Sequence, residues 1–142
     1  MDSTTVVREQ IDFGEKLIEH LLREGFDVSA AFWLKESERN RWDFYIVSTV
    51  RDQDHGGSYG QLLPLMRQMP RPYWIDPQEV RLLGTSDQLA KDVLKIYERS
   101  ARTGVHPQLW DGSVLGRRGI DAKYFYFIPG TKEPQAAGAS GG

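Results

Sequence analysis

Cysteine is absent from the 142-residue sequence. The chain therefore forms no disulfide, offers no thiolate nucleophile and has no zinc site built on cysteine. Long apolar runs are missing too, since no uncharged stretch approaches the ~20 residues of a membrane-spanning helix. The first residues, MDSTTVVREQ, lack the basic and apolar parts of a secretory signal. We therefore expect a soluble protein of the cytoplasm with no membrane partner.

A large charge of either sign is also absent, because 18 Lys and Arg residues face 20 Asp and Glu residues, for a net charge of -2. No overall positive field attracts nucleic acid or anionic lipid, so any such binding has to be local. The composition, 39% hydrophobic, 11% aromatic and 27% charged, is typical of a globular protein rather than a disordered one. A chain of this length is enough for one domain with a sizeable core.

Hydrophobic periodicity predicts the helices and strands. Residues 7–24 have the spacing of an amphipathic helix that ends at Gly25. Alternation in 26–35 and the aromatic and β-branched residues of 42–50 predict a hairpin with a polar turn at 36–41. The other predicted elements are a helix that begins near Gln61, a strand at 79–84, a helix that follows a capping box at 85–88 and ends at Gly104, a short strand at 113–115 and a strand at 122–129.

The order of these elements, α-β-β-α-β-α-β, determines the fold class that we predict. Strands joined by hairpins, with helices beside them, indicate an α+β fold with a mainly antiparallel sheet of four or five strands. We expect the helices to pack on one face of this sheet, within a single domain over residues 1–130. Residues 131–142, rich in glycine, alanine and serine, have the composition of a flexible tail.

Three segments of the sequence resemble a group of short bacterial proteins that have no assigned function. They are LIEHLLREGFDVSAAFWLKESERNRWDFYIVSTV, WIDPQEVRLLG and GSVLGRRGIDAKYFYFIP, and the resemblance spans most of residues 14–129. The resemblance implies a compact bacterial domain. It assigns no catalytic or binding role to any residue of this chain.

Aromatic residues on the predicted sheet are candidates for a binding surface. Alternation along the hairpin suggests that Trp33 and Tyr45 share a face, opposite Phe32. If helices cover only the other face, these rings and one aromatic pair of the last strand are exposed, and large exposed apolar patches usually mark a partner interface. The predicted partner-binding residues are Trp33, Tyr45, Phe125 and Phe127. We therefore expect a non-catalytic accessory or protein-protein interaction domain that binds a protein partner or a second copy of itself. Helices on both faces, or residues 70–77, would instead cover this surface.

A basic segment before the last strand suggests a second function, local binding of RNA or single-stranded DNA. Arg117, Arg118 and Lys123 could neutralise phosphates, while the aromatic side chains that follow could stack on bases. The sequence has neither the element order nor the glycine-aromatic motif of an RNA-recognition motif. An ordinary basic turn beside a core strand explains the same residues.

An acidic loop suggests a third function, a metal-dependent hydrolase or nuclease. Asp52, Asp54 and His55 precede two glycines, and carboxylates with an imidazole can hold a divalent metal or transfer protons. Glu36 and Asp43 could join a nuclease site, but the predicted hairpin places them at its other end. No phosphate-binding loop, nucleophile elbow or three-histidine site accompanies these residues. We predict no cofactor and no metal, and interpret the loop first as a turn.

Overall fold

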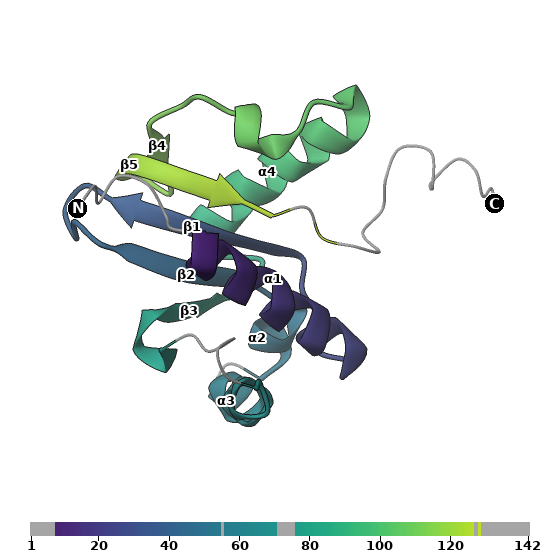
Figure 1. Cartoon of the computed structure of the whole chain (residues 1–142). Coiled ribbons are helices and arrows are strands. Elements are labelled where there is room, and N and C mark those ends of the chain that lie inside the picture. The colour runs from purple at the N-terminus through teal and green to yellow at the C-terminus, as the bar shows by residue number, and fades with distance from the viewer. Residues whose placement is uncertain (1–7, 55, 71–75, 127, 129–142) are drawn as a thin grey trace.

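The computed structural model describes residues 8–54, 56–70, 76–126 and 128. Within these residues the chain forms the predicted α+β fold (Figure 1). The helices are α1 (Arg8–Arg23), α2 (Thr49–Gln53), α3 (Ser58–Arg67) and α4 (Gln88–Thr103), with the short 3-10 helices η1 (Pro77–Glu79) and η2 (Pro107–Leu109). The strands are β1 (Ala30–Glu36), β2 (Trp42–Val47), β3 (Val80–Leu83), β4 (Val114–Leu115) and β5 (Arg118–Phe125). No helix of the described part is both long and apolar enough to span a bilayer.

The sheet is mixed, with the strand order β3-β2-β1-β5-β4. Strand β1 lies at its centre and is antiparallel to both of its neighbours, β2 and β5. Strand β4 is also antiparallel to β5, whereas β3 runs parallel to β2. The parallel pair arises because the chain passes through α2 and α3 between β2 and β3, and a parallel pair requires such a crossover. The predicted mainly antiparallel sheet is confirmed, with this one parallel pair added.

Helices cover both faces of the sheet, so the predicted packing on one face is wrong. On one face, Leu17 of α1 and Leu62 of α3 pack in a cluster with Trp33. On the other, Leu89 of α4 packs in a second cluster with Phe32, and Figure 1 shows α1 and α4 on opposite sides of the strands. All seven residues of β1 are buried. A strand that is apolar on both sides needs a cover on both sides, because each face buries its own apolar area.

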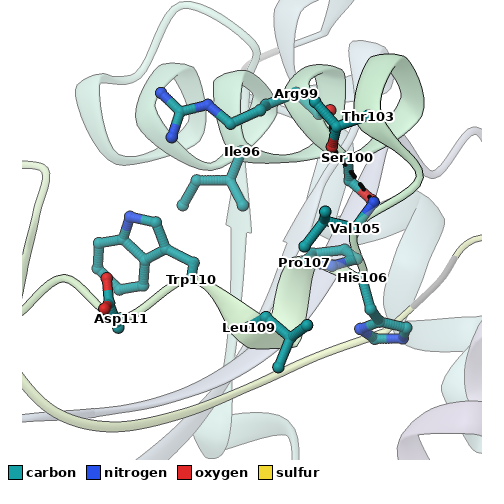
Figure 2. A pocket seen from close by; sticks show the side chains of 10 residues that line it. All are labelled: Ile96, Arg99, Ser100, Thr103, Val105, His106, Pro107, Leu109, Trp110 and Asp111. Carbon is teal, nitrogen blue, oxygen red and sulfur yellow. Dashed lines mark hydrogen bonds between the residues drawn. The ribbon is translucent and has the colours of Figure 1, made fainter.

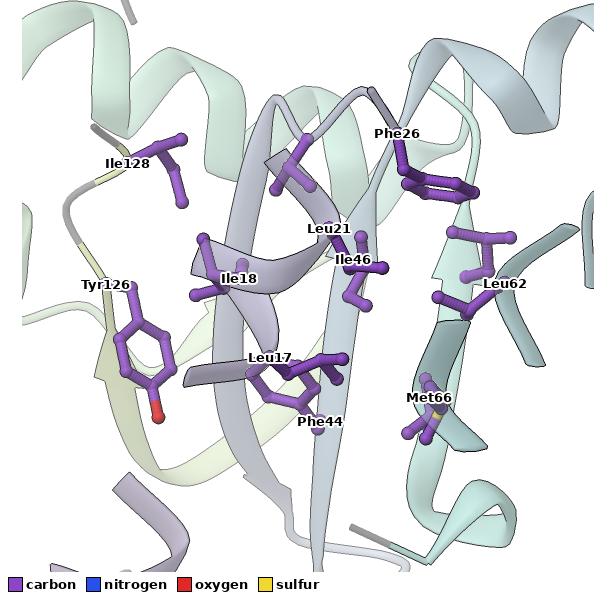
Figure 3. Packing of buried hydrophobic residues seen from close by; sticks show 14 of the residues in the cluster. Leu17, Ile18, Leu21, Phe26, Phe44, Ile46, Leu62, Met66, Tyr126 and Ile128 are labelled. Atoms are coloured by element: carbon purple, nitrogen blue, oxygen red, sulfur yellow. The ribbon is translucent and has the colours of Figure 1, made fainter. Parts of the chain in front are cut away.

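Helix α1 approaches the sheet closely at Tyr126. Figure 3 shows Leu17 of α1 lying over Phe44 of β2, with Tyr126 at the side of this cluster. The indole Nε1 of Trp33 donates to the Tyr126 hydroxyl oxygen at 3.0 Å, and that hydroxyl donates to the carbonyl oxygen of Ile11 in α1 at 2.7 Å. Burial raises the pKa of Tyr126, so the hydroxyl keeps the proton that this chain of hydrogen bonds requires. A glycine at position 14 makes the approach possible.

Replacement of Gly14 by alanine is expected to destabilise the protein by about 2 kcal/mol, as overpacking of a buried contact does. The added methyl group would overlap the Tyr126 hydroxyl and lie 2.7 Å from its Cζ. The ~1 kcal/mol by which alanine favours a helix over glycine offsets part of an overpacking cost of about 3 kcal/mol, which leaves a net loss of about 2 kcal/mol. Urea unfolding gives the difference. A methyl group added at Gly60 of α3 would meet no atom within 4 Å, so Gly60→Ala is the matched control and should be neutral or stabilising. Equal effects at both positions would contradict the close approach.

Two local predictions at the helix starts differ from the structure. The strand predicted over 42–50 ends at Val47 in the structure. Ser48 then caps α2 by accepting a hydrogen bond from the Val50 N–H. At α4 the N-cap is Asp87, whose carboxylate accepts hydrogen bonds from two backbone N–H groups of the first turn. The predicted cap, Thr85, donates its hydroxyl and its N–H to Asp52 instead. The end of α4 at Gly104, in the left-handed conformation, is confirmed.

Candidate functional site

The predicted aromatic surface is not exposed. The exposed fractions of Trp33, Tyr45 and Phe125 are 0%, 2% and 1%, and Phe127 lies outside the described residues. Trp33 pairs with Phe44 in the β1–β2 register and Tyr45 pairs with Phe32, so Trp33 and Tyr45 lie on opposite faces. The prediction that they share one open face is wrong. Trp33 lies in one core, and Tyr45 and Phe125 lie in the other.

The predicted basic segment does not form one basic surface. The Arg118 guanidinium lies 3.1 Å from Glu36 Oε2. Lys123 Nζ donates to the carbonyl oxygen of Gln108 at 2.9 Å, and partial burial lowers the pKa of Lys123. Arg117 is exposed in the turn between β4 and β5. Because two of the three cations are already engaged within the chain, their placement does not favour the nucleic-acid alternative.

Two buried carboxylates lie at the turn end of the β1–β2 hairpin. Asp43 is 1% exposed, and its ion-pair partners are Arg39 at 2.8 Å, Arg41 at 3.3 Å and Arg81 at 3.9 Å. Its Oδ2 accepts a hydrogen bond from Arg39, while Oδ1 has the ion-pair distance to Arg41 without hydrogen-bond geometry. Glu36 accepts hydrogen bonds from Arg118 and from the hydroxyl of Tyr45. Burial first, and Glu36 next, raise the pKa of Tyr45, which keeps this donor protonated. Each buried carboxylate is therefore compensated by arginine side chains of the same fold.

The carboxylates of the 52–57 loop also serve the fold. Asp52 lies in α2 and binds Thr85, which fixes the chain before α4. Asp54 accepts hydrogen bonds from the Gly57 N–H at 3.0 Å and from Gln61 at 3.3 Å. His55 lies outside the described residues, and within the described ones no three His, Asp or Glu side chains gather as metal ligands would. The arrangement therefore does not favour the hydrolase or nuclease alternative.

The contact between Asp52 and Thr85 predicts a pH dependence. Hydrogen bonds from the Thr85 hydroxyl and N–H lower the pKa of Asp52 from its ordinary value of 3.8. A lowered folded-state pKa gives stability that is present above the unfolded value and is lost as the pH falls through the folded one. Asp52→Asn is therefore expected to be less stable than the original chain at pH 7, and the difference should shrink below about pH 4.

Urea unfolding of both proteins at pH 7, 5, 4 and 3 measures this difference. Glu98→Gln, at an exposed carboxylate of α4, is the control and should leave the pH dependence unchanged. A difference between Asp52→Asn and the original chain that stays constant down to pH 3 would show that the Asp52 charge does not stabilise the fold.

A groove runs beside α4, on the side of the sheet that η2 and β4 border. Its larger hollow has a volume of about 260 Å³, and Figure 2 shows Ile96 and Arg99 of α4 facing Leu109 and Trp110 across it. A second hollow of about 220 Å³ shares Ile96, Arg99 and Trp110 with the first and continues to Val114. We call the two hollows together the α4 groove. The residues that line it are Asp92, Lys95, Ile96, Arg99, Ser100, Thr103, Val105, His106, Pro107, Leu109, Trp110, Asp111, Val114 and Leu115.

Large apolar side chains are exposed at this groove. In the part of the chain that the structure describes, the large hydrophobic residues that are exposed are Val105, Leu109 and Val114, with exposed fractions of 49%, 70% and 59%. All three line the α4 groove. Single exposed apolar residues are ordinary, but their concentration at one concave place is typical of a binding surface.

The wall that carries Leu109 and Trp110 is fixed to the sheet by Gln108. The Gln108 side-chain amide donates to the carbonyl oxygen of Lys123 at 3.1 Å and accepts from the N–H of Phe125 at 2.8 Å. The amide therefore takes the place of a neighbouring strand at these two groups of the β5 edge. The Trp110 ring packs edge to face against Phe125, with centroids 6.3 Å apart. The groove is consequently formed before any ligand arrives.

We did not predict this groove from the sequence. Val105, Leu109 and Trp110 occur in GVHPQLWDG, a segment with turn residues at both ends. Three large apolar side chains in such a connection are the feature that could have indicated it.

The comparisons with known proteins add no assignment to this geometry. The chain matches no protein-family model, no curated protein and no solved structure.

Proposed function

We propose that this domain is a non-catalytic protein-interaction module that binds its partner through the α4 groove. The observation that carries the proposal is the concentration of exposed Val105, Leu109 and Val114 around a preformed apolar hollow. Binding that covers these side chains removes apolar area from water, at about 25 cal/mol per Å² before the costs of association. The interaction surface thus differs from the aromatic face that the sequence suggested.

The size of the groove favours a segment of a protein over a small metabolite. Each hollow, about 260 and 220 Å³, is smaller than the ~300 Å³ at the lower end of ordinary ligand pockets. Two adjoining shallow hollows suit successive side chains of one peptide segment. Hot spots of protein interfaces are commonly formed by such anchors in small pockets.

The substitution Leu109→Asp tests the proposal. We expect it to abolish partner binding, because a carboxylate would replace the apolar side chain that the partner covers and would lose its hydration in the interface. Its effect on the free energy of unfolding should stay within about 0.5 kcal/mol, since Leu109 is 70% exposed. The measurement is quantitative affinity purification of tagged proteins from the native host, with circular dichroism as the check of folding.

Gln78→Asp is the matched control, because it adds the same carboxylate at an exposed position before β3, at the other edge of the sheet. Partners that Gln78→Asp retains and Leu109→Asp loses would support the α4 groove. Equal recovery of the same partners by Leu109→Asp and by the original chain would refute it.

A further inference from the structure

Two cations of α4 border the groove without an ion-pair partner among the described residues. Lys95 and Arg99 are four residues apart, so their side chains project from the same side of the helix. Both are exposed, and both line the hollow that continues towards Val114. Arg99 also lines the larger hollow, where Figure 2 shows its guanidinium on the same side of the groove as Ile96.

The acidic residues that line the groove are Asp92 and Asp111. Asp92 Oδ2 accepts a hydrogen bond from the N–H of Gly116 at 2.7 Å, and Oδ1 accepts one from Gln88 at 3.0 Å. Burial lowers the pKa of Lys123, and the charge of Asp111 opposes that shift. Among the described residues neither carboxylate forms an ion pair with Lys95 or Arg99. This side of the groove therefore presents positive charge next to an apolar hollow.

We propose that the partner segment in the α4 groove is an acidic, apolar peptide. One of its large apolar side chains enters the hollow between Ile96, Leu109 and Trp110, and a neighbouring Asp or Glu binds Arg99, with Lys95 adding to the attraction. A guanidinium matches a carboxylate in shape and forms charge-assisted hydrogen bonds with it. A neutral or basic segment would leave the two cations partly desolvated and uncompensated. This inference rests on the proposed function, because it requires the α4 groove to be the interface.

A library of random 12-residue peptides displayed on phage is the probe. The library is selected on the immobilised full chain, and peptides that also bind Leu109→Asp are removed. The enriched sequences are expected to carry Asp or Glu within a few residues of Leu, Ile, Phe or Trp. A synthetic peptide with the consensus should change the fluorescence of the chain's tryptophans, and its affinity should fall as salt rises.

Charge reversal then tests the role of Arg99. Arg99→Glu is expected to weaken binding of the consensus peptide at least tenfold, and a peptide with lysine in place of its acidic residues should prefer this variant. Lys91→Glu is the matched control, because Lys91 is exposed on the same helix and does not line the groove. It should change the affinity less than threefold.

The outcomes separate the inference from the proposed function. Enriched peptides that require Leu109 but lack acidic residues would overturn the inference. So would peptides whose affinity for Arg99→Glu equals their affinity for the original chain. Either result would still support the α4 groove as the interface. A library that shows no enrichment once the peptides that also bind Leu109→Asp have been removed would overturn both. Single-stranded DNA that displaces the consensus peptide and loses affinity in Arg99→Glu would assign the cations to phosphate instead.

Discussion

Replacing Trp33 with alanine is expected to lower the free energy of unfolding by about 3–5 kcal/mol, the usual cost of removing a buried large aromatic side chain. Trp33 has no exposed surface, and its ring packs against Phe44 with centroids 5.0 Å apart. The substitution leaves a cavity beneath α1 and removes the donor to the Tyr126 hydroxyl. Since domains of this size are stable by only about 5–15 kcal/mol, the variant should lose much of its stability.

Denaturant unfolding, followed by far-UV circular dichroism, measures this loss. Trp110→Ala is a useful comparison, because Trp110 is only partly buried and lines the groove. We expect it to cost less stability than Trp33→Ala and to weaken partner binding. If Trp33→Ala instead kept the stability of the original chain and lost partner binding, Trp33 would be part of an exposed binding surface, as the sequence suggested.

Asp43→Ala is expected to cost about 3 kcal/mol, near the lower end of the range for breaking a buried ion pair. The carboxylate is 1% exposed and faces three arginines, so its removal leaves their charges without a common partner. The cost lies at the lower end because these arginine side chains are 32–52% exposed and can be rehydrated. The hairpin turn and the start of β3 should loosen together, since Arg39 and Arg81 come from these two elements.

Urea unfolding of Asp43→Ala, Arg39→Ala and the double variant gives the interaction energy of this pair by a double-mutant cycle. Glu38→Ala, at an exposed position of the same turn, is the control and should change stability by less than about 0.5 kcal/mol. A loss below about 1 kcal/mol for Asp43→Ala would place the cluster among ordinary surface ion pairs.

Local patterns predicted most of the elements, because local physics determines them. The apolar spacing of α1 and the glycine that ends α4 act within a few residues, and both elements are found where we expected them. The start of α4 has two candidate caps, because Thr85 and Asp87 are both residues that cap helices well. The tertiary contact of Thr85 with Asp52 decides between them, and no local pattern contains that contact.

The register between β1 and β2 determines which face of the sheet each hairpin side chain occupies. The sequence does not determine this register. The turn 37–41 has no residue pair that demands one register. A shift by one residue moves every side chain of a strand to the other face. We placed Trp33 with Tyr45, whereas the structure pairs Trp33 with Phe44. This error put Trp33 and Tyr45 on one face. The expectation of helices on a single face came separately from the order of the elements, and the exposed aromatic face required both.

The α4 groove could not be predicted for a different reason. It is assembled from α4, from the connection around η2 and from β4, and its wall depends on the contact of Gln108 with the edge of β5. Each piece is an ordinary surface segment by itself. Only their packing turns Val105, Leu109 and Val114 into neighbours of one concave surface.

The central position of β1 has a consequence for synthesis of the chain on the ribosome. Its partner β2 follows within a few residues, but its other partner is β5, and Phe32 pairs with Phe125. At about 5–20 residues per second, roughly ten seconds separate the emergence of β1 from that of β5. During this interval the free side of β1 can pair with another nascent chain. Slower initiation of translation, which spaces ribosomes further apart, should therefore raise the yield of correctly folded protein.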